Sequence, residues 1–128
     1  MPGKFIGIAF RTRPDGHYEN FYLRPTNGRA QDQLARNHSV QYAAPPEWPW
    51  ARLRAETPGQ FESYADMQPG EWTRMRIAVH GKEASLFVGA AEQPCLIVKD
   101  LKLGDSEGGV ALWIGPGTDA YFRNLTIQ

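Results

Sequence analysis

The sequence predicts an all-β fold, an antiparallel β-sandwich of the jelly-roll type that forms a single domain over residues 1–128. Thirteen glycines and ten prolines divide the chain into short apolar segments, which is typical of many strands joined by turns. Several segments alternate between apolar and polar residues with the period of two that a strand requires. A length of 128 residues also fits the ~100–150 residues of one domain with one core.

The first predicted element is a hairpin. Residues 4–12 (KFIGIAFRT) and 17–25 (HYENFYLRP) are the strands, and PDG at 14–16 is the turn, since proline presets φ and glycine accepts a positive φ. Alternation in the second strand places Tyr18, Asn20, Tyr22 and Arg24 on one face and Glu19, Phe21 and Leu23 on the other. The two strands and their tight turn therefore predict a hairpin.

Residues 27–50 fit no regular element well and predict a long loop or a short helix. Within GRAQDQLARNH, Ala30, Leu34 and Ala35 have helix-like spacing. The stretch then runs through HSVQYAAPPEWPW, which contains several prolines and two tryptophans. Long irregular insertions on rigid sheets often carry binding sites.

The second half contains five more predicted strands, at residues 71–81, 84–88, 95–101, 108–115 and 119–127. Trp72 is expected in the core with Met75, Ile77 and Val79, which share one face of the first of these strands. GGVALWIG at 108–115 is apolar enough to be buried on both faces, so Trp113 is expected in the core as well. Cys95 is expected to be a small buried residue.

The composition argues against several classes of function. Lys+Arg and Asp+Glu both number 14, so there is no basic excess to favour nucleic acid or an anionic membrane as partner. No apolar run approaches the ~20 residues that span a bilayer, and no signal peptide is visible; the compartment stays open. One cysteine excludes an intrachain disulfide, and three scattered histidines lack metal-ligand spacing. We therefore expect neither a metal site nor a cofactor.

The segments GEWTRMRIAV, ASLFVGAAEQPCLIV and GGVALWIGPGTDAYFRNLTI together resemble the concanavalin A-like lectin/glucanase superfamily. The resemblance is to laminin G-like domains and bacterial domains of the 3-keto-disaccharide hydrolase type, and FYLRPTNGRAQDQLARNHSVQY also resembles one branch. It implies a concanavalin A-like sandwich over roughly residues 5–127. This fold hosts lectins, hydrolases, lyases and adhesion modules, so the resemblance alone does not define the function.

The chain departs from that superfamily in one respect. Its members usually carry strands ahead of the segment that matches FIGIAFR, and this sequence begins almost at that segment. Unpaired sheet edges are seldom left open. We therefore expect a second copy of the chain, as a homodimer, or the C-terminal segment to cover the edge.

The candidate binding residues are polar and aromatic side chains in and around residues 27–50. Aromatic faces stack on sugar rings, and planar polar groups bind hydroxyls or carboxylates. The set is Arg24, Asn27, Arg36, Asn37, Gln41, Trp50, Arg52 and Arg54. Arg52 and Arg54 would share a strand face at i, i+2 spacing. The alternative is that the arginines pair with carboxylates of the chain.

His38 and Tyr42 are the candidate catalytic residues for acid–base chemistry, although a lone histidine beside a loop is more often structural. The carboxylate pair of a glycosidase is not evident, because Glu62 and Asp66 would lie ~13 Å apart on a strand. The sequence therefore favours a domain that binds or processes carbohydrate and recognises a hydroxylated or acidic sugar. A glycoside hydrolase or lyase on the same scaffold, and a structural domain that forms a homodimer, are the alternatives.

Overall fold

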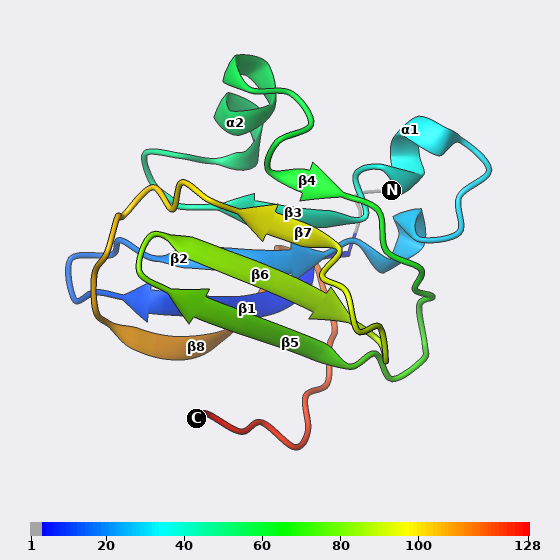
Figure 1. Ribbon diagram of the computed structural model, residues 1–128. Helices are drawn as coiled ribbons and strands as arrows, with labels where there is room; N and C mark the ends of the chain where they lie inside the picture. Colours follow the sequence, from blue (N-terminus) through cyan, green and yellow to red (C-terminus); the bar gives the residue numbers. More distant parts are fainter. Residues whose placement is uncertain (1–3) are drawn as a thin grey trace.

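A computed structural model describes residues 4–128 as two antiparallel β-sheets with two short helices (Figure 1). The strands are β1 (Ile6–Thr12), β2 (Glu19–Leu23), β3 (Val40–Ala43), β4 (Glu62–Ser63), β5 (Met75–His80), β6 (Glu83–Val88), β7 (Leu96–Val98) and β8 (Gly109–Ile114). A 3-10 turn, η1 (Pro25–Asn27), precedes the helices α1 (Gln33–Arg36) and α2 (Trp50–Glu56). The all-β prediction is confirmed.

The five-stranded sheet has the order β4-β3-β2-β1-β8, and the three-stranded sheet has the order β5-β6-β7. The chain thus builds four strands of the first sheet, forms the whole second sheet, and returns to add β8 beside β1. In Figure 1 the second sheet lies in front of the first. The predicted hairpin is correct, since β1 and β2 pair antiparallel from Ile6–Leu23 to Phe10–Glu19.

The hydrophobic core lies between the two sheets. Phe21 and Tyr42 from the large sheet and Leu86 and Val98 from the small sheet are almost completely buried there. Met75 and Ile77 pack against this cluster at its margin. Alternation correctly assigns these apolar residues to one face of each strand, because successive side chains of a strand point to opposite faces.

The central strands β2 and β3 are buried on both faces. Their second face, which we call the outer face, is covered in part by α2, whose Leu53 is 1% exposed. The segment ARLRAE consists of good helix formers, and α2 ends ahead of Pro58, because the residue before a proline disfavours helical geometry. α2 thus covers part of the outer face.

The stretch 27–50 is more regular than the sequence indicated. The short helix expected there is α1, and Asp32 caps it by accepting a hydrogen bond from the backbone N–H of Leu34. The same stretch also contains β3, which lies inside the large sheet between β2 and β4. The description of residues 27–50 as an irregular insertion is therefore wrong for this strand.

Four predictions for the second half are wrong. Val79, expected in the core, is 37% exposed. Trp72 is 58% exposed rather than in the core, and the side chain of Arg123 stacks on its ring at 4.0 Å. β8 is not buried on both faces, since Val110, Leu112 and Ile114 are 41–50% exposed. Residues 119–127 form no strand; Figure 1 shows this segment as an irregular run to the C-terminus. β8 forms the margin of the large sheet, where fewer neighbours are available to cover its apolar side.

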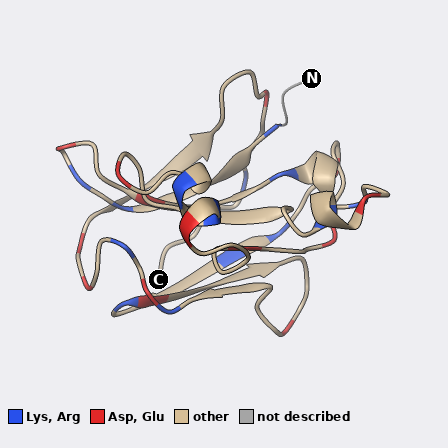
Figure 2. Ribbon diagram, turned by 90° about the horizontal axis from the view of Figure 1, so that it is seen from above, with Lys and Arg blue, Asp and Glu red and all other residues tan. Residues whose placement is uncertain are grey.

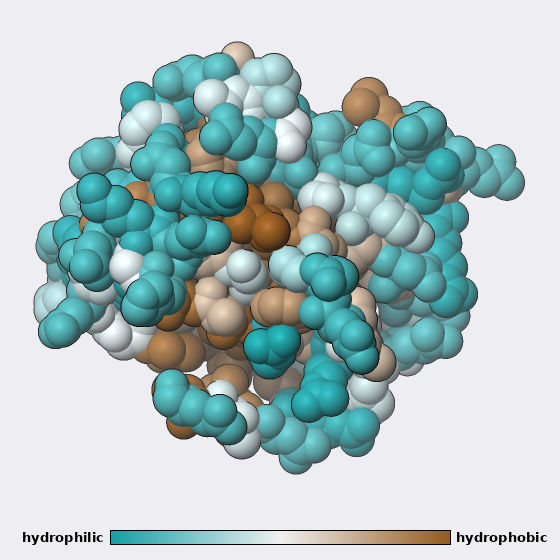
Figure 3. Space-filling model, in the orientation of Figure 1, coloured by the Kyte–Doolittle hydropathy of each residue, from teal (hydrophilic) through white to brown (hydrophobic). Residues whose placement is uncertain are grey.

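Figure 3 shows the same margin as surface. Brown, apolar atoms are visible at the lower left, where Figure 1 places β8, and also in the centre of this view. Charged residues of both signs are interspersed along the ribbon, as Figure 2 shows, and α2 carries both. Electrostatic effects in this protein therefore arise within local clusters of charged side chains and not from one large region of a single sign.

Candidate functional site

A row of five directly opposed residues crosses the outer face of the large sheet. Strand register pairs Trp113 with Gly7, Gly7 with Tyr22, Tyr22 with Gln41, and Gln41 with Glu62. Directly opposed residues lie on the same face of a sheet. The row therefore runs from an aromatic end on β8 to a charged end on β4.

Gly7 lets the two aromatic residues of this row meet. A Cβ at Gly7 would lie 2.1 Å from the carbonyl oxygen of Phe21 and 2.7 Å from Cβ of Tyr22. Since no side chain separates them, the rings of Trp113 and Tyr22 contact each other across β1 with centroids 4.7 Å apart. Trp113 is thus half-buried on the outer face, rather than between the sheets.

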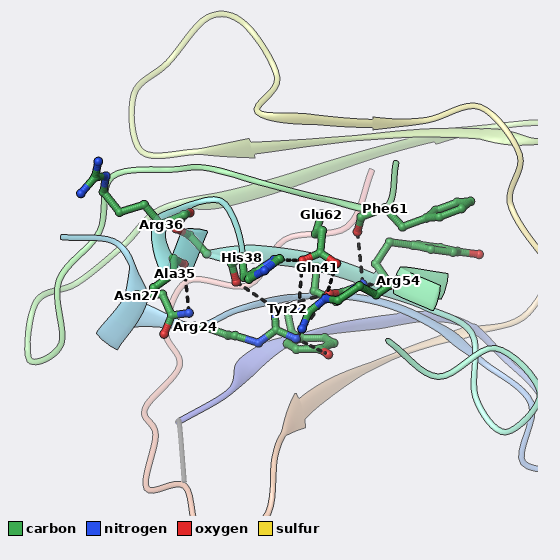
Figure 4. Close-up of polar contacts among 12 residues, drawn as sticks. Tyr22, Arg24, Asn27, Ala35, Arg36, His38, Gln41, Arg54, Phe61 and Glu62 are labelled. Carbon is green, nitrogen blue, oxygen red and sulfur yellow. Dashed lines mark hydrogen bonds and ion pairs between the residues drawn. The ribbon is translucent and has the colours of Figure 1, made fainter. Parts of the chain in front are cut away.

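Arg24 is a buried cation beside this row (Figure 4). Its guanidinium donates to the carbonyl oxygen of His38 at 2.7 Å, to the hydroxyl of Tyr22 at 3.2 Å and to Oε1 of Gln41 at 3.3 Å. Burial lowers the pKa of Arg24 while Tyr22 opposes the shift, and an arginine still remains protonated at neutral pH. All three hydrogen-bond acceptors of Arg24 are neutral groups, so they satisfy its donors without cancelling its charge.

Glu62 at the end of the row holds a second arginine and a histidine. Arg54 donates to both carboxylate oxygens of Glu62 at 2.9 Å, and Nδ1 of His38 contacts Oε1. The bidentate geometry fixes the carboxylate. Arg24 and Arg54 carry two positive charges in this cluster and Glu62 one negative charge, and Arg24 makes its hydrogen bonds to neutral groups.

One ring nitrogen of His38, Nδ1, faces the carboxylate of Glu62. Burial lowers its pKa, and the positive charges of Arg54 and Arg24 lower it further, against an opposing effect of Asp32. With Nδ1 against Oε1 of Glu62, a neutral ring that keeps its proton on Nδ1 presents Nε2 as an acceptor. Nε2 has no hydrogen-bond partner among the described residues.

An open hollow of about 730 Å³ lies over this cluster. It is lined by six polar side chains, Asn37, His38, Arg54, Glu62, Ser63 and Tyr64, and by Leu34, Pro58 and Gly59. Within residues 4–128, no hydrogen bond engages the side chains of Asn37, Ser63 or Tyr64. We call this site the polar hollow. It presents an aromatic ring, an amide, two hydroxyls, a ring nitrogen and a guanidinium to one space.

A second, smaller cavity of about 170 Å³ lies on the same face, beyond Trp50. Its floor includes Asn20, which is 1% exposed and whose amide oxygen and nitrogen both have no partner among residues 4–128. An unpaired buried amide costs about 1–3 kcal/mol. We call this site the aromatic cavity, because Phe5, Tyr22, Trp50 and Trp113 surround it.

Four of the residues predicted to bind ligand lie at or directly beneath the polar hollow. Asn37 and Arg54 line it, whereas Arg24 and Gln41 form its buried support. Trp50 lies between the two cavities, with the guanidinium of Arg54 4.7 Å from its ring. α2 brings Trp50 and Arg54 together, since residues at i and i+4 share one helix face.

Three other predicted binding residues serve the fold. Asn27 donates to the carbonyl oxygen of Ala35, and Arg36 donates to the carbonyl oxygen of Ala30. Arg52 pairs with Glu56 on α2. Arg52 and Arg54 do not share a strand face, because they lie on a helix, where a spacing of two points side chains in different directions.

Tyr42 lies on the opposite side of the sheet from His38. Its hydroxyl donates to the buried carboxylate of Glu19 and accepts from the backbone N–H of Lys102 at 2.9 Å. Burial raises the pKa of Tyr42 far above its usual range, and the neighbouring Glu19 adds to the shift. The prediction that His38 and Tyr42 form one site is therefore wrong in this geometry, because alternation along β3 directs Tyr42 into the core.

The sequence-based prediction missed Glu62, Ser63 and Tyr64 in the polar hollow and Asn20 in the aromatic cavity. One signal was available for Asn20, since it alternates with Tyr22 and Arg24 on the polar face of its strand. No local signal was available for the residues of β4, because its two-residue pairing with β3 is a long-range contact. The sequence suggested Glu62 as half of a carboxylate pair with Asp66, which instead pairs with Arg29, and as one of the carboxylates that could pair with the arginines, which its contact with Arg54 bears out.

Residues 4–128 outside the two cavities show neither a metal-binding cluster nor a reactive thiol. Residues 4–128 contain no group of three or more His, Cys, Asp or Glu that could hold a metal ion. Burial raises the pKa of Cys95 to about 11, so the thiol stays protonated near neutral pH and is a weak nucleophile. No helix over residues 4–128 is long and apolar enough to cross a membrane.

No protein-family model, curated protein or solved structure matches this chain.

Proposed function

We propose that this chain is a carbohydrate-binding domain of the concanavalin A-like type, which recognises a hydroxylated or acidic sugar in the polar hollow. The observation that carries the proposal is the convergence of Asn37, His38, Arg54, Ser63 and Tyr64 on one space of about 730 Å³. Ligand pockets of small molecules are typically ~300–1,000 Å³. The free hydrogen-bonding groups of these side chains give this space the donors and acceptors that sugar hydroxyls require.

The fold supports the same proposal. The segments that resemble the concanavalin A-like superfamily correspond to β5, β6, β7 and β8, and together with β1–β4 they build two facing sheets. The hollow lies on the large sheet, on the face turned away from the small sheet. A rigid sheet with a partly open face is a suitable support for recognition.

The charge of the cluster favours an acidic sugar. Arg24 and Arg54 carry two positive charges, of which Glu62 balances one. Arg54 already uses Nε and Nη2 for Glu62, so its Nη1 remains for a ligand. A carboxylate on the ligand would complete the charge balance of a site in which Arg24 is buried and Arg54 is partly exposed to the hollow.

The test is titration of the protein with glucuronate and with methyl glucoside, followed by calorimetry or NMR. We expect tighter binding of glucuronate, and we expect Asn37→Ala and Tyr64→Ala to weaken it about tenfold each. Arg52→Ala is the matched control: it lies on the same helix as Arg54 but outside the hollow, so it should leave affinity unchanged. Affinity that is equal in the wild type, Asn37→Ala and Tyr64→Ala would reject the polar hollow as the site.

One observation favours an enzyme as the second candidate. The carboxylate of Glu62 orients His38 while Arg54 fixes that carboxylate, which resembles the support that a general base receives in many active sites. In a lyase reaction on a uronic acid, Nε2 of His38 would remove the proton at C5 as the C4–O bond breaks. A C4–C5 double bond forms, and the leaving oxygen takes up a proton from solvent.

Incubation with uronic acid polymers tests this second candidate through the ultraviolet absorbance of the new double bond. We expect His38→Gln to abolish the signal while glucuronate affinity stays within a few fold. Binding without any turnover in the wild type would leave the domain as a lectin. Hydrolysis by two carboxylates is not supported, because Glu62 is the one carboxylate among the residues that line the described hollow.

A further inference from the structure

We infer that the aromatic cavity is a second binding site, which takes one neutral sugar ring and holds it through the amide of Asn20. This inference rests on the proposed function for the class of ligand, but it uses other residues. The cavity contains no residue of the polar hollow and is lined instead by aromatic rings, prolines and one polar side chain on its floor.

Small residues on the sheet create the cavity. Next to the row that contains Trp113 and Tyr22, strand register aligns Ala111 with Ala9, Ala9 with Asn20, and Asn20 with Ala43. Of these alanines, Ala43 lines the cavity beside Asn20, and its small side chain leaves a trough between the larger residues around it. Asn20 is the one polar side chain in this second row, so the trough has a single, defined point of hydrogen bonding.

The amide of Asn20 indicates what the trough binds. Both of its polar atoms lack partners although the residue is 1% exposed, and buried polar groups are normally hydrogen-bonded. A primary amide offers one acceptor and two donors in one plane, which matches two adjacent hydroxyls of a sugar. A wholly apolar ligand would leave the amide unpaired.

The side walls of the aromatic cavity indicate that its ligand is a ring. Trp50, which is 44% exposed, and Trp113 provide flat apolar surfaces. The indole nitrogen of Trp113 donates to the hydroxyl of Tyr18 at 3.3 Å, which fixes the orientation of that wall. A volume of about 170 Å³ corresponds to roughly six water molecules at ~30 Å³ each. That space accommodates one small ring and excludes a chain of several.

Arg24 excludes a cationic ligand. Its guanidinium lies 5.1 Å from the ring centroid of Tyr22, 5.6 Å from that of Phe5 and 5.9 Å from that of Trp50. These aromatic rings already interact with one positive charge, and a second cation would be repelled. Because the hydrogen bonds of Arg24 point toward His38, Gln41 and Tyr22, the cavity itself offers no guanidinium donor to an anion. A neutral sugar ring is therefore the class of ligand that fits this cavity.

The test uses the methyl glycosides of glucose, galactose, mannose and N-acetylglucosamine as probes, with the indole N–H resonances of Trp50 and Trp113 as the NMR readout. We expect saturable shifts with at least one probe. Asn20→Ala should weaken its binding tenfold or more and leave the melting temperature unchanged or raised, since the substitution removes an unpaired polar group. Trp50→Ala should weaken binding similarly. Asn37→Ala and Tyr64→Ala are the controls that should keep it.

Three results would overturn the inference: no saturable shift with any probe, affinity of Asn20→Ala within twofold of wild type, or a lowered melting temperature of Asn20→Ala with binding retained. If Asn20→Ala does not fold, an unchanged affinity in Trp50→Ala would overturn it equally. Glucuronate binding that depends on Asn37, with no methyl glycoside binding that depends on Asn20, would leave the proposed function standing alone. The reverse pattern would retain the aromatic cavity and reject the polar hollow.

Discussion

Two buried polar residues on opposite faces of the large sheet, Glu19 and Asn20, differ in how the chain satisfies their hydrogen bonds. On the inner face, Oε1 of Glu19 accepts hydrogen bonds from the hydroxyl of Tyr42 and from the backbone N–H of Leu103, and only Oε2 is left unpaired. On the outer face, neither polar atom of Asn20 has a partner within residues 4–128. Polar groups that the chain satisfies itself belong to the fold, whereas those left open beside a cavity are suited to a ligand.

The largest expected difference in the free energy of unfolding is between two substitutions that remove an aromatic side chain, one on each face of the sheet. Phe21 is completely buried on the inner face, so Phe21→Ala should lower the free energy of unfolding by about 3–5 kcal/mol. Trp50→Ala on the outer face should cost about 1 kcal/mol or less, because almost half of the ring is already exposed. Urea denaturation of both variants measures this. Equal losses would show that the outer face is as much a part of the core as the inner one.

A smaller difference is expected between two tyrosine hydroxyls. Tyr42→Phe removes the partner of both Glu19 and the Lys102 backbone N–H, so the free energy of unfolding should fall by about 1–3 kcal/mol. Tyr64→Phe should change it by less than about 0.5 kcal/mol while weakening glucuronate binding. Thermal denaturation and calorimetry separate the two effects; a Tyr42→Phe protein as stable as wild type would contradict the inner-face assignment.

The buried carboxyl of Glu19 on the inner face makes the free energy of unfolding depend on pH. Burial raises its pKa above the ordinary value of 4.5, against the opposing hydrogen bonds of Tyr42 and Leu103. The folded state then binds the proton more tightly than the unfolded state, so this stabilisation is fully present below about pH 4.5 and is lost as pH rises through the folded pKa. Glu19→Gln should therefore be more stable than wild type at pH 7, and this advantage should shrink toward pH 4.

Unfolding curves of wild type and Glu19→Gln at several pH values measure this difference. Asp66→Asn is a suitable control on the surface, since its pairing with Arg29 lowers the pKa of the Asp66 carboxyl. The pH dependence of that control should have the opposite sign. An advantage of Glu19→Gln that stays constant from pH 4 to pH 7 would argue against a raised pKa.

The smallest effect on stability is expected at the open margin of the large sheet. The homodimer expected from the sequence would pair β8 with β8 of a second copy and cover Val110, Leu112 and Ile114. Leu112→Lys should then dissociate a dimer seen by sedimentation at tens of micromolar, and shift the free energy of unfolding of the monomer by about 0.5 kcal/mol or less. A strict monomer in the wild type would reject the homodimer.

Local patterns in the sequence were sufficient for most strands. Alternation over residues 4–12 and 17–25, with PDG between them, predicted the β1–β2 hairpin, and alternating or short apolar segments between turns predicted β5, β6, β7 and β8. It also placed Asn20, Tyr22 and Arg24 on one face, which the structure shows. This succeeds because the period of two is a property of the backbone of each strand, whatever its neighbours are.

Tertiary structure decided which faces are covered and which residues meet. The exposure of Trp72 and of β8 depends on how far the small sheet extends over the large one, and no segment encodes that by itself. Likewise His38 meets Glu62 and Arg54 only because β4 pairs with β3 and α2 folds over both. The sequence by itself determined most of the strands and the polar character of the outer face, because these depend on neighbouring residues. Only the fold decided that Tyr42 enters the core while Asn20 lines a cavity, because those outcomes depend on packing between segments far apart in the chain.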